Sequence, residues 1–458
     1  MRRHQLTIAL IAGLTALSSA ASAADLAQIY EMARASDPQL AAAESQMLAA
    51  GEGVVQARSA LLPNLSASAS YGDSNSDSSS ITSIPNEDGT VSFGQADGGG
   101  DTTTRTYQLR LTQSIYNHSN YTRLRGARAG ASQGEAAYDR ANDELIVRVA
   151  TAYFEALTAT TNLDAVKAEE TAVKRQLEQA QQRFEVGLSA ITDVHEAQAR
   201  YDAARAAAIL AQFQLDDAYE ALNELTGKPV SDLRPVAEKL ALTSPVPDDS
   251  EAWVKTAEAE NPLLSVRRFA LEQAEQAVAT AKAGHLPTLG ADYTWIDQTT
   301  SGDRFSNDVT FPADGDFADH GFGVVLNVPI FEGLATQSKV RQESHNRDVA
   351  ADQYEQELRM IVRNTRKAYR AVAAGITEVE ARSQALVSAQ SALDATQAGF
   401  EVGTRTIVDV LISQQVLFQA QRDYALSRHN YLLNSLRLKQ AAGTITVADL
   451  QAVNAVLQ

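Results

Sequence analysis

The stretch FEVGLSAITDV at residues 184–194 returns as FEVGTRTIVDV at residues 400–410, an offset of 216 positions. The same offset holds on both sides, in the pairs Tyr138 and Tyr354, Gln198 and Gln414, and Gly227 and Gly443. Nearer the N-terminus the offset is 224, in the pairs Pro38 and Pro262, and Leu62 and Leu286. A repeat this long indicates a duplicated supersecondary unit. We therefore expect two copies of a helix, a strand pair and a long helical hairpin. Such a chain is suited to an elongated, oligomeric protein.

The N-terminus has the features of an export signal. Arg2 and Arg3 precede an apolar run over residues 6–17, and Ala21 and Ala23 are spaced for signal-peptidase cleavage. We expect residues 1–23 to be a signal peptide. No later segment has 18 or more uninterrupted apolar residues, so we expect no helical membrane span after processing.

The composition excludes several kinds of binding site and catalytic site. The chain contains no cysteine, which excludes disulfides, thiolate metal sites and a lipidated N-terminal cysteine. Its formal net charge is −18, and loss of Arg2 and Arg3 with the signal gives −20, a balance that repels nucleic acid and anionic lipid headgroups. The histidines are scattered, His195 lacks the second histidine of a zinc-protease helix, and no GxSxG or Walker loop occurs. We expect no enzyme activity, cofactor or metal.

Four segments alternate apolar and polar residues, as strands do. They cover residues 64–72, 104–116, 288–297 and 321–331, about the 9 to 11 residues that cross a bilayer at a tilt. A half-buried soluble sheet shows the same alternation. The connections over residues 72–103 and 298–320 are long and rich in Ser, Gly and Asp, which favours an outer-membrane barrel with long external loops.

Four strands cannot close a barrel, and open edges in lipid leave unpaired N–H and C=O groups. The chain must therefore assemble. Two copies would supply roughly eight strands, whose interior side chains fill the barrel, whereas three would supply about twelve and leave a passage. A trimer is the assembly that yields a pore.

The helical segments are longer than those of a globular domain. No proline lies between Tyr116 and Phe184, and a heptad stripe indicates close coiled-coil-like packing through Val149, Ala152, Ala156, Ala159, Leu163 and Val166. One helix over most of this segment would extend on the order of 90 to 100 Å. We expect Val186-Gly187 and Val402-Gly403 to turn the chain into return helices over about 190–226 and 406–442, which stop at Gly227 and Gly443.

Several stretches together resemble the TolC family of outer-membrane efflux proteins. They are VGTRTIVDVL at 402–411, NYLLNSLRLKQAAGTI at 430–445, VPIFEGL at 328–334, and the duplicated tip itself. The resemblance implies a homotrimer with one twelve-stranded β-barrel in the outer membrane of a Gram-negative bacterium, four strands coming from each protomer. A long α-helical barrel continues it across the periplasm.

On this resemblance, a periplasmic adaptor docks at the helical tips near Val186, Gly187, Val402 and Gly403, together with an inner-membrane transporter of the RND, ABC or MFS type. Matching positions assign Arg405, Asp193, Thr192 and Phe400 to a latch that keeps the periplasmic end closed, and Asp409 to a constriction ring. Ile412 stands where the family has a second aspartate, and Phe400 where it often has a tyrosine. We expect one carboxylate ring beside an apolar ring.

The expected order is a signal peptide over 1–23, a first repeat over 24–227, an equatorial connector over 228–252, a second repeat over 253–447 and a C-terminal tail over 448–458. The predicted function is a passive conduit that opens when the helices uncoil at the tip and exports small molecules or unfolded proteins. The alternatives are a non-conducting helical spacer or adhesin, and an exported enzyme on a helical scaffold.

Overall fold

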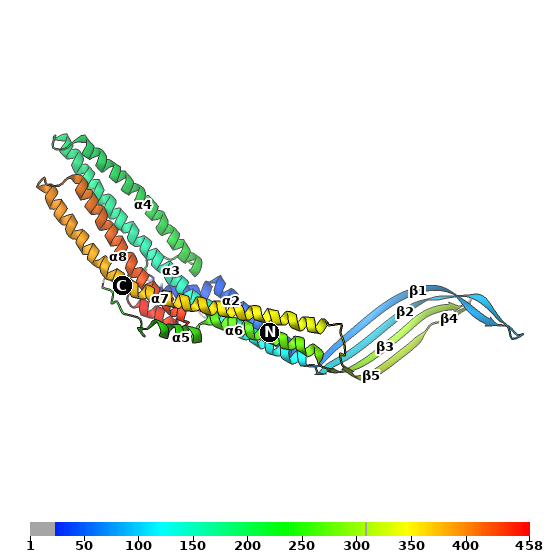
Figure 1. Ribbon diagram of the computed structural model, residues 1–458. Coiled ribbons are helices and arrows are strands. Elements are labelled where there is room, and N and C mark those ends of the chain that lie inside the picture. The colour runs from blue at the N-terminus through cyan, green and yellow to red at the C-terminus, as the bar shows by residue number, and fades with distance from the viewer. Residues whose placement is uncertain (1–22, 238, 307–308) are drawn as a thin grey trace, which may run out of the picture. The chain divides into compact units, whose positions relative to one another are not determined.

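The computed structural model describes residues 23–458 apart from residue 238 and residues 307–308, so the predicted signal peptide lies outside the described residues except for Ala23. The chain divides into two compact units. Unit 1 contains the described residues up to Ala42, Arg140–Asn261 and Met360–Gln458; unit 2 contains Ala43–Asp139 and Pro262–Arg359. Each unit contains segments from both copies of the repeat, because the long helix of each copy has one part in unit 1 and the other in unit 2. Figure 1 labels the elements.

Unit 2 contains an antiparallel sheet of β1 (Asn64–Pro85), β2 (Val91–Tyr116), β3 (Thr288–Ser306), β4 (Val309–Pro312) and β5 (Gly315–Asn327). Strand β2 pairs with both β1 and β3. Strands β5 and β4 pair with successive parts of β3, Thr288–Thr300 and Asp303–Ser306. The sheet is therefore four strands wide, with β1 along one edge and β4 and β5 along the other (Figure 1).

The strands are much longer than the sequence predicted. The segment expected to be a loop over residues 72–103 is mostly strand, and so is the segment over 298–320. Ladder bonds join backbone groups, so Ser and Gly residues can continue a pairing that carries no apolar side chains. The predicted strand over 321–331 instead ends at Asn327, two residues before Pro329, which has no N–H to donate to a ladder.

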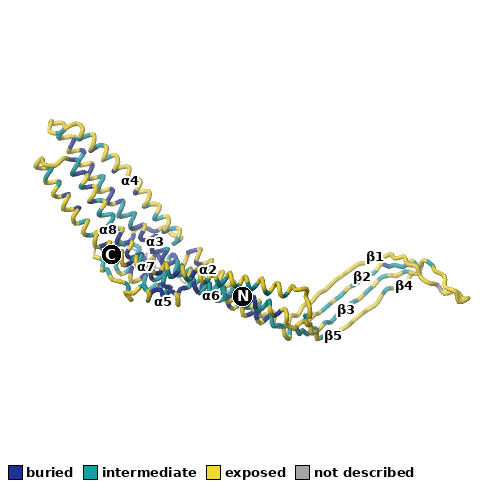
Figure 2. The backbone as a smooth tube through the Cα atoms, viewed as in Figure 1, coloured by how far each residue is buried: buried dark blue, intermediate teal, exposed yellow. Residues whose placement is uncertain are grey.

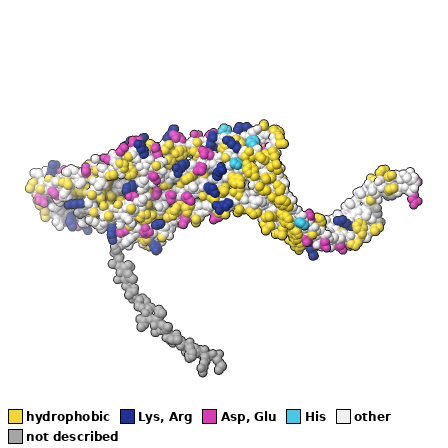
Figure 3. Space-filling model, turned by 90° about the horizontal axis from the view of Figure 1, so that it is seen from below, with side chains coloured by type: hydrophobic (Ala, Val, Ile, Leu, Met, Phe, Trp, Pro, Cys, Tyr) yellow, Lys and Arg dark blue, Asp and Glu magenta, His cyan; other side chains and the backbone are white. Residues whose placement is uncertain are grey.

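Helices complete unit 2 beside the strands. They are the greater part of α2 (Pro38–Ser59), all of α6 (Pro262–Lys282) with the short η1 (Ala283–His285), and the strand-proximal parts of α3 (His118–Glu185) and α7 (Ala335–Glu401). Both α2 and α6 begin with proline, which is well suited to the first helical position. Within this unit, Figure 3 shows apolar side chains gathered where the helices give way to the strands. None of the described helices is both long enough and apolar enough to cross a membrane.

The long helices have the predicted extent. Helices α3 and α7 contain 68 and 67 residues, which corresponds to about 100 Å each. The predicted heptad stripe of α3 is buried except at Ala159, which is half-buried. The return helices α4 (Ile191–Thr226) and α8 (Ile407–Ala442) end at Gly227 and Gly443 with φ of +64° and +72°. These left-handed caps confirm the predicted helix stops.

The remaining elements form a small layer in unit 1: α1 (Leu26–Ser36), α5 (Ser250–Glu260) and α9 (Val447–Asn454). The Tyr153 hydroxyl of α3 donates to the carbonyl oxygen of Arg234 at 2.8 Å and so ties the connector to the helices. The predicted C-terminal tail over 448–458 is largely helix α9, because Thr446 and Asp449 form a capping box at its start and Leu450 and Val453 are buried. Figure 2 shows burial concentrated in the helical segments.

Candidate functional site

The predicted turns lie at the free ends of the two helical hairpins in unit 1. Gly187 and Gly403 have φ of +76° and +80°, a left-handed conformation that other residues rarely adopt. Each glycine N–H donates to the carbonyl of the phenylalanine three residues earlier, Phe184 at 2.9 Å and Phe400 at 3.1 Å. Val186 and Val402 are 69% and 76% exposed. The two copies thus make the same turn and present the same apolar residue to solvent.

The helices that leave these turns begin differently. Helix α8 starts with a capping box in which Thr406 accepts the Asp409 N–H, and the Asp409 carboxylate accepts from the Thr406 N–H and hydroxyl at 2.9 Å each. Helix α4 has Ala190 at the corresponding position, and Ala190 makes no capping bond. The second hairpin therefore has a fixed helix start that the first lacks.

The capping box favours the charged form of Asp409. Hydrogen bonds from the Thr406 backbone and side chain lower the pKa of Asp409, and the nearby Arg405 charge adds to the effect. Only Oδ2 takes part in the two bonds from Thr406, so Oδ1 is available to other groups. Ile412, one turn along α8, is 46% exposed. An acidic and an apolar side chain therefore lie next to one another near this tip.

The proposed latch residues are not joined within one protomer. In the described part of the chain, the Arg405 guanidinium has no hydrogen bond or ion pair, and neither has the Asp193 carboxylate. The Arg405 side chain instead lies against Gly399, where a built Cβ would be only 2.7 Å from Arg405 Cγ. Thr192 is exposed on the first turn of α4.

Phe400 makes the most extensive side-chain contacts of this set. It packs against a cluster built from α3, α4 and α8, which contains Val173, Leu177, Ala180, Ala197, Ile407 and Leu411. It also packs against a second cluster from α7 and α8, which contains Ala389, Leu393, Val410 and Leu417. The Arg183 guanidinium carbon lies 5.0 Å from the centre of the Phe400 ring. Sequence reasoning missed Arg183, although it directly precedes the repeated tip.

Two polar links between the hairpins were also missed. Arg422 of α8 contacts Glu169 of α3 at 3.4 Å, and Arg200 of α4 donates to Gln415 of α8 at 3.2 Å. The side chains of Glu169 and Arg422 are only 19% and 20% exposed, so this ion pair is partly shielded from water. Both links join helices far apart in the sequence, which residue spacing alone does not reveal.

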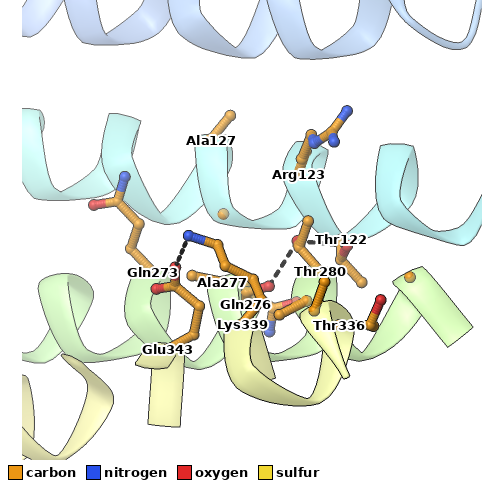
Figure 4. A pocket seen from close by; sticks show the side chains of 14 residues that line it. Thr122, Arg123, Ala127, Gln273, Gln276, Ala277, Thr280, Thr336, Lys339 and Glu343 are labelled. Carbon is orange, nitrogen blue, oxygen red and sulfur yellow. Dashed lines mark hydrogen bonds and ion pairs between the residues drawn. The ribbon is translucent and has the colours of Figure 1, made fainter. Parts of the chain in front are cut away.

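Unit 2 contains a groove of about 830 Å³ between α3, α6 and α7 (Figure 4). Lys339 and Glu343 form an ion pair at 2.8 Å on one wall, and Thr122 and Thr280 share a hydrogen bond of 2.7 Å on another. The hydrogen bond from Lys339 lowers the pKa of Glu343. Over the residues that the structure describes, no three His, Cys, Asp or Glu side chains are grouped to hold a metal.

Comparison with known proteins gives the family. The sequence profile described as outer membrane efflux protein matches residues 29–228 and 253–444, one segment in each copy of the repeat. This chain belongs to the outer membrane efflux protein family. It is 39% identical to the outer membrane protein TolC of Vibrio cholerae over 98% of this chain and 97% of that protein. It is 29% identical to the alkaline protease secretion protein AprF of Pseudomonas aeruginosa over 93% and 86%.

The fold of this outer membrane efflux protein also occurs in a solved structure. The CmeC outer membrane channel of Campylobacter jejuni matches with a TM-score of 0.74 at 19% identity, covering 94% of this chain and 90% of that one. The predicted family, the mixed helix and strand fold and the outer-membrane location are confirmed. Membership assigns the chain a transport role.

Proposed function

We propose that three copies of this chain form one closed conduit from the periplasm through the outer membrane. The order β1-β2-β3 with β5 on the far side of β3 is the observation that carries this proposal. Strands β1 and β5 are its outer strands, and each unpaired N–H or C=O group in lipid costs several kcal/mol. Pairing β5 of one copy with β1 of the next removes both edges and gives a twelve-stranded barrel. A barrel of this size begins to leave an aqueous passage.

The apolar part of the strands fits this placement. Tyr107, Leu109, Leu111 and Ile115 of β2 are exposed in the single chain. They occupy one parity over a length close to the roughly 9 to 11 residues that cross the hydrocarbon core. The Ser, Gly and Thr residues that continue β1 and β2 extend the sheet beyond the membrane. The long helices then form the periplasmic part.

The helical tips are the gate. Three copies of Asp409 form a carboxylate ring, with Ile412 as the apolar ring beside it. Arg405 of one protomer pairs with Asp193 of its neighbour, and Thr192 adds a polar contact. This assignment is supported by the absence of any hydrogen bond or ion pair for the Arg405 and Asp193 charged groups within the described part of one protomer. An exposed arginine–carboxylate contact contributes about 0.2 to 1 kcal/mol, so a docking protein can break it.

The exposed apolar tips and the family membership support the proposed partners. A periplasmic adaptor docks at the turns around Val186, Gly187, Val402 and Gly403, where apolar side chains are exposed. An inner-membrane transporter of the RND, ABC or MFS type supplies the energy, and the conduit itself is passive. The proposed cargo is small molecules and unfolded secreted proteins; the family description as an efflux protein supports efflux, and the name of the alkaline protease secretion protein AprF supports the secretion of protein.

Single-channel recording in planar bilayers tests the proposal. The wild type should give a small closed-state conductance, and Arg405→Ala or Asp193→Ala should increase it. Arg175→Ala, at an exposed position on α3, is the matched charge control and should leave the conductance unchanged. A non-conducting spacer, adhesin or enzyme shows no channel in any variant. If channels form but neither latch substitution changes their conductance, the proposed conduit stands and the proposed latch is refuted.

A further inference from the structure

The repeated tips have the same phenylalanine in two different environments. Phe184 is 42% exposed at the end of α3, whereas Phe400 at the end of α7 is half-buried and packs against both apolar clusters. Among the hydrophobic residues that the structure describes, Phe400 is the only one from α7 that packs against the cluster of α3, α4 and α8. Its ring therefore joins the end of the second hairpin to the first.

Arg183 lies at this junction. Its guanidinium carbon is 5.0 Å from the centre of the Phe400 ring, within the roughly 6 Å at which a cation is attracted to an aromatic face. Among the described residues no carboxylate lies within ion-pair distance of Arg183, so the ring is the partner that the structure shows for its charge. The equivalent residue in the second copy is Gly399, so the arrangement occurs once per protomer.

We infer that Arg183 is a positioning residue of the gate, which holds the α7 end closed by stacking on Phe400. The inference rests on the proposed conduit. A tyrosine at position 400 could use a hydroxyl to hold the tip, but phenylalanine has only its face and edge to offer. Arg183 uses that face. Opening the tip by moving α7 and α8 away from α3 breaks the stack, and the closed state loses its stabilisation.

The size of the effect follows from the strength of such contacts. A cation–π contact at a partly exposed site changes the open-to-closed ratio by about fivefold, equivalent to ~1 kcal/mol. Three independent protomers multiply this to on the order of 100-fold for complete opening. The stack depends less on a matched opposite charge than an ion pair does, so moderate salt should weaken it less than the proposed Arg405 contact.

The test is the open fraction of purified trimers in planar bilayers. Arg183→Gln, which keeps a long polar side chain without the charge, should raise the open fraction about fivefold or more. Arg183→Lys should restore most of the closed state, because an ammonium also binds an aromatic face. Phe400→Leu should open the channel, and adding Arg183→Gln to it should cause no further opening. Trimer stability to heating is measured alongside, so that any poorly folded variant is identified. If another variant folds poorly, Arg183→Lys is compared with the wild type.

Two matched controls isolate the contact. Arg175→Gln removes an exposed charge two turns earlier on α3, and Phe184→Leu changes the equivalent exposed ring; both should leave the open fraction at the wild-type value. The inference is overturned if Arg183→Gln stays closed while Arg405→Ala opens, or if Arg183→Gln and Phe400→Leu add independently. An absence of channels in every variant, Arg405→Ala included, overturns the proposed function and this inference with it.

Discussion

The two partners of the ion pair between Asp37 and Arg148 should contribute unequally to the stability of unit 1: removing Arg148 should destabilise the unit more than neutralising Asp37. Both Asp37 oxygens accept from the guanidinium, at 3.1 and 2.5 Å, and Oδ2 also accepts the Leu40 N–H at the start of α2. The Asp37 side chain is 3% exposed, but Arg148 is 30% exposed. Removing the arginine therefore strands a buried carboxylate, whereas Asp37→Asn leaves a guanidinium that can reach water and keeps a capping side chain.

The magnitudes separate the two variants. Stranding a buried charge costs about 3 to 5 kcal/mol, and losing a hydrogen bond to a charged group costs about 1.5 to 3 kcal/mol. Unfolding entropy for a chain of this length is ~1 kcal/mol per K. Thermal unfolding followed by circular dichroism at a fixed scan rate should therefore give Tm losses of about 3 to 5 °C for Arg148→Met and about 1.5 to 3 °C for Asp37→Asn.

Acid supplies a second readout for the same pair. Burial raises the pKa of Asp37, but hydrogen bonds from Arg148 and Leu40 and the Arg148 charge outweigh it, so the pKa lies below its ordinary value. A lowered folded pKa gives stability that is present above the unfolded pKa and is lost as pH falls through the folded one. Asp37→Asn should remove this acid-dependent part. An Arg148→Met variant that costs no more than Asp37→Asn would refute the asymmetry.

Three further outcomes are expected. Burial and the neighbouring Arg428 lower the pKa of His429 to about 4. Between pH 6.5 and 4 this histidine is protonated in the unfolded chain but not in the folded one, so stability falls as the pH falls through this range. His429→Gln should flatten that part of a Tm–pH curve. Asp409→Ala should weaken block of single channels by multivalent cations, while Asp394→Ala, an exposed carboxylate on α7, should not. Unheated protein in mild detergent should migrate as a trimer that dissociates on heating, since β1 and β5 need partners; a monomer contradicts the barrel.

The fold was largely legible in the sequence because its signals are local. The ends of α4 and α8 each have a left-handed residue, and Gly227 and Gly443 supply it. The heptad stripe of α3 needs only spacing along one helix. Strand length was underestimated for a physical reason: the prediction used side-chain alternation, whereas the pairing of Asn75 with Asp101 uses backbone groups and is indifferent to their polarity. The helix α9 was missed although Thr446 and Asp449 carry its capping signal.

The site was less accessible to sequence reasoning. The resemblance to the family suggested Arg405, Asp193 and Asp409 as site residues. The capping role of Asp409 could also have been predicted from the sequence, because Thr406 lies three residues before it, as a capping box requires. The stack of Arg183 on Phe400 could not, because it depends on which helices of two distant hairpins adjoin. The same holds for the link between Glu169 and Arg422. Contacts between elements are set by packing, which a single sequence does not encode in its spacing.

The two tips of the duplicated unit share a turn but differ in the residues around it. The turn needs only Val-Gly, and both copies keep it. The residues around it differ in ways that assign separate roles: Ala190 leaves the Asp193 carboxylate unused by a cap, whereas Thr406 holds Asp409 on its own helix. Gly399 gives Arg405 room beside α7, while Arg183 at the equivalent place reaches Phe400. The first tip thus has an aspartate that caps no helix, whereas in the second tip the aspartate caps its own helix and Arg405 lies beside α7.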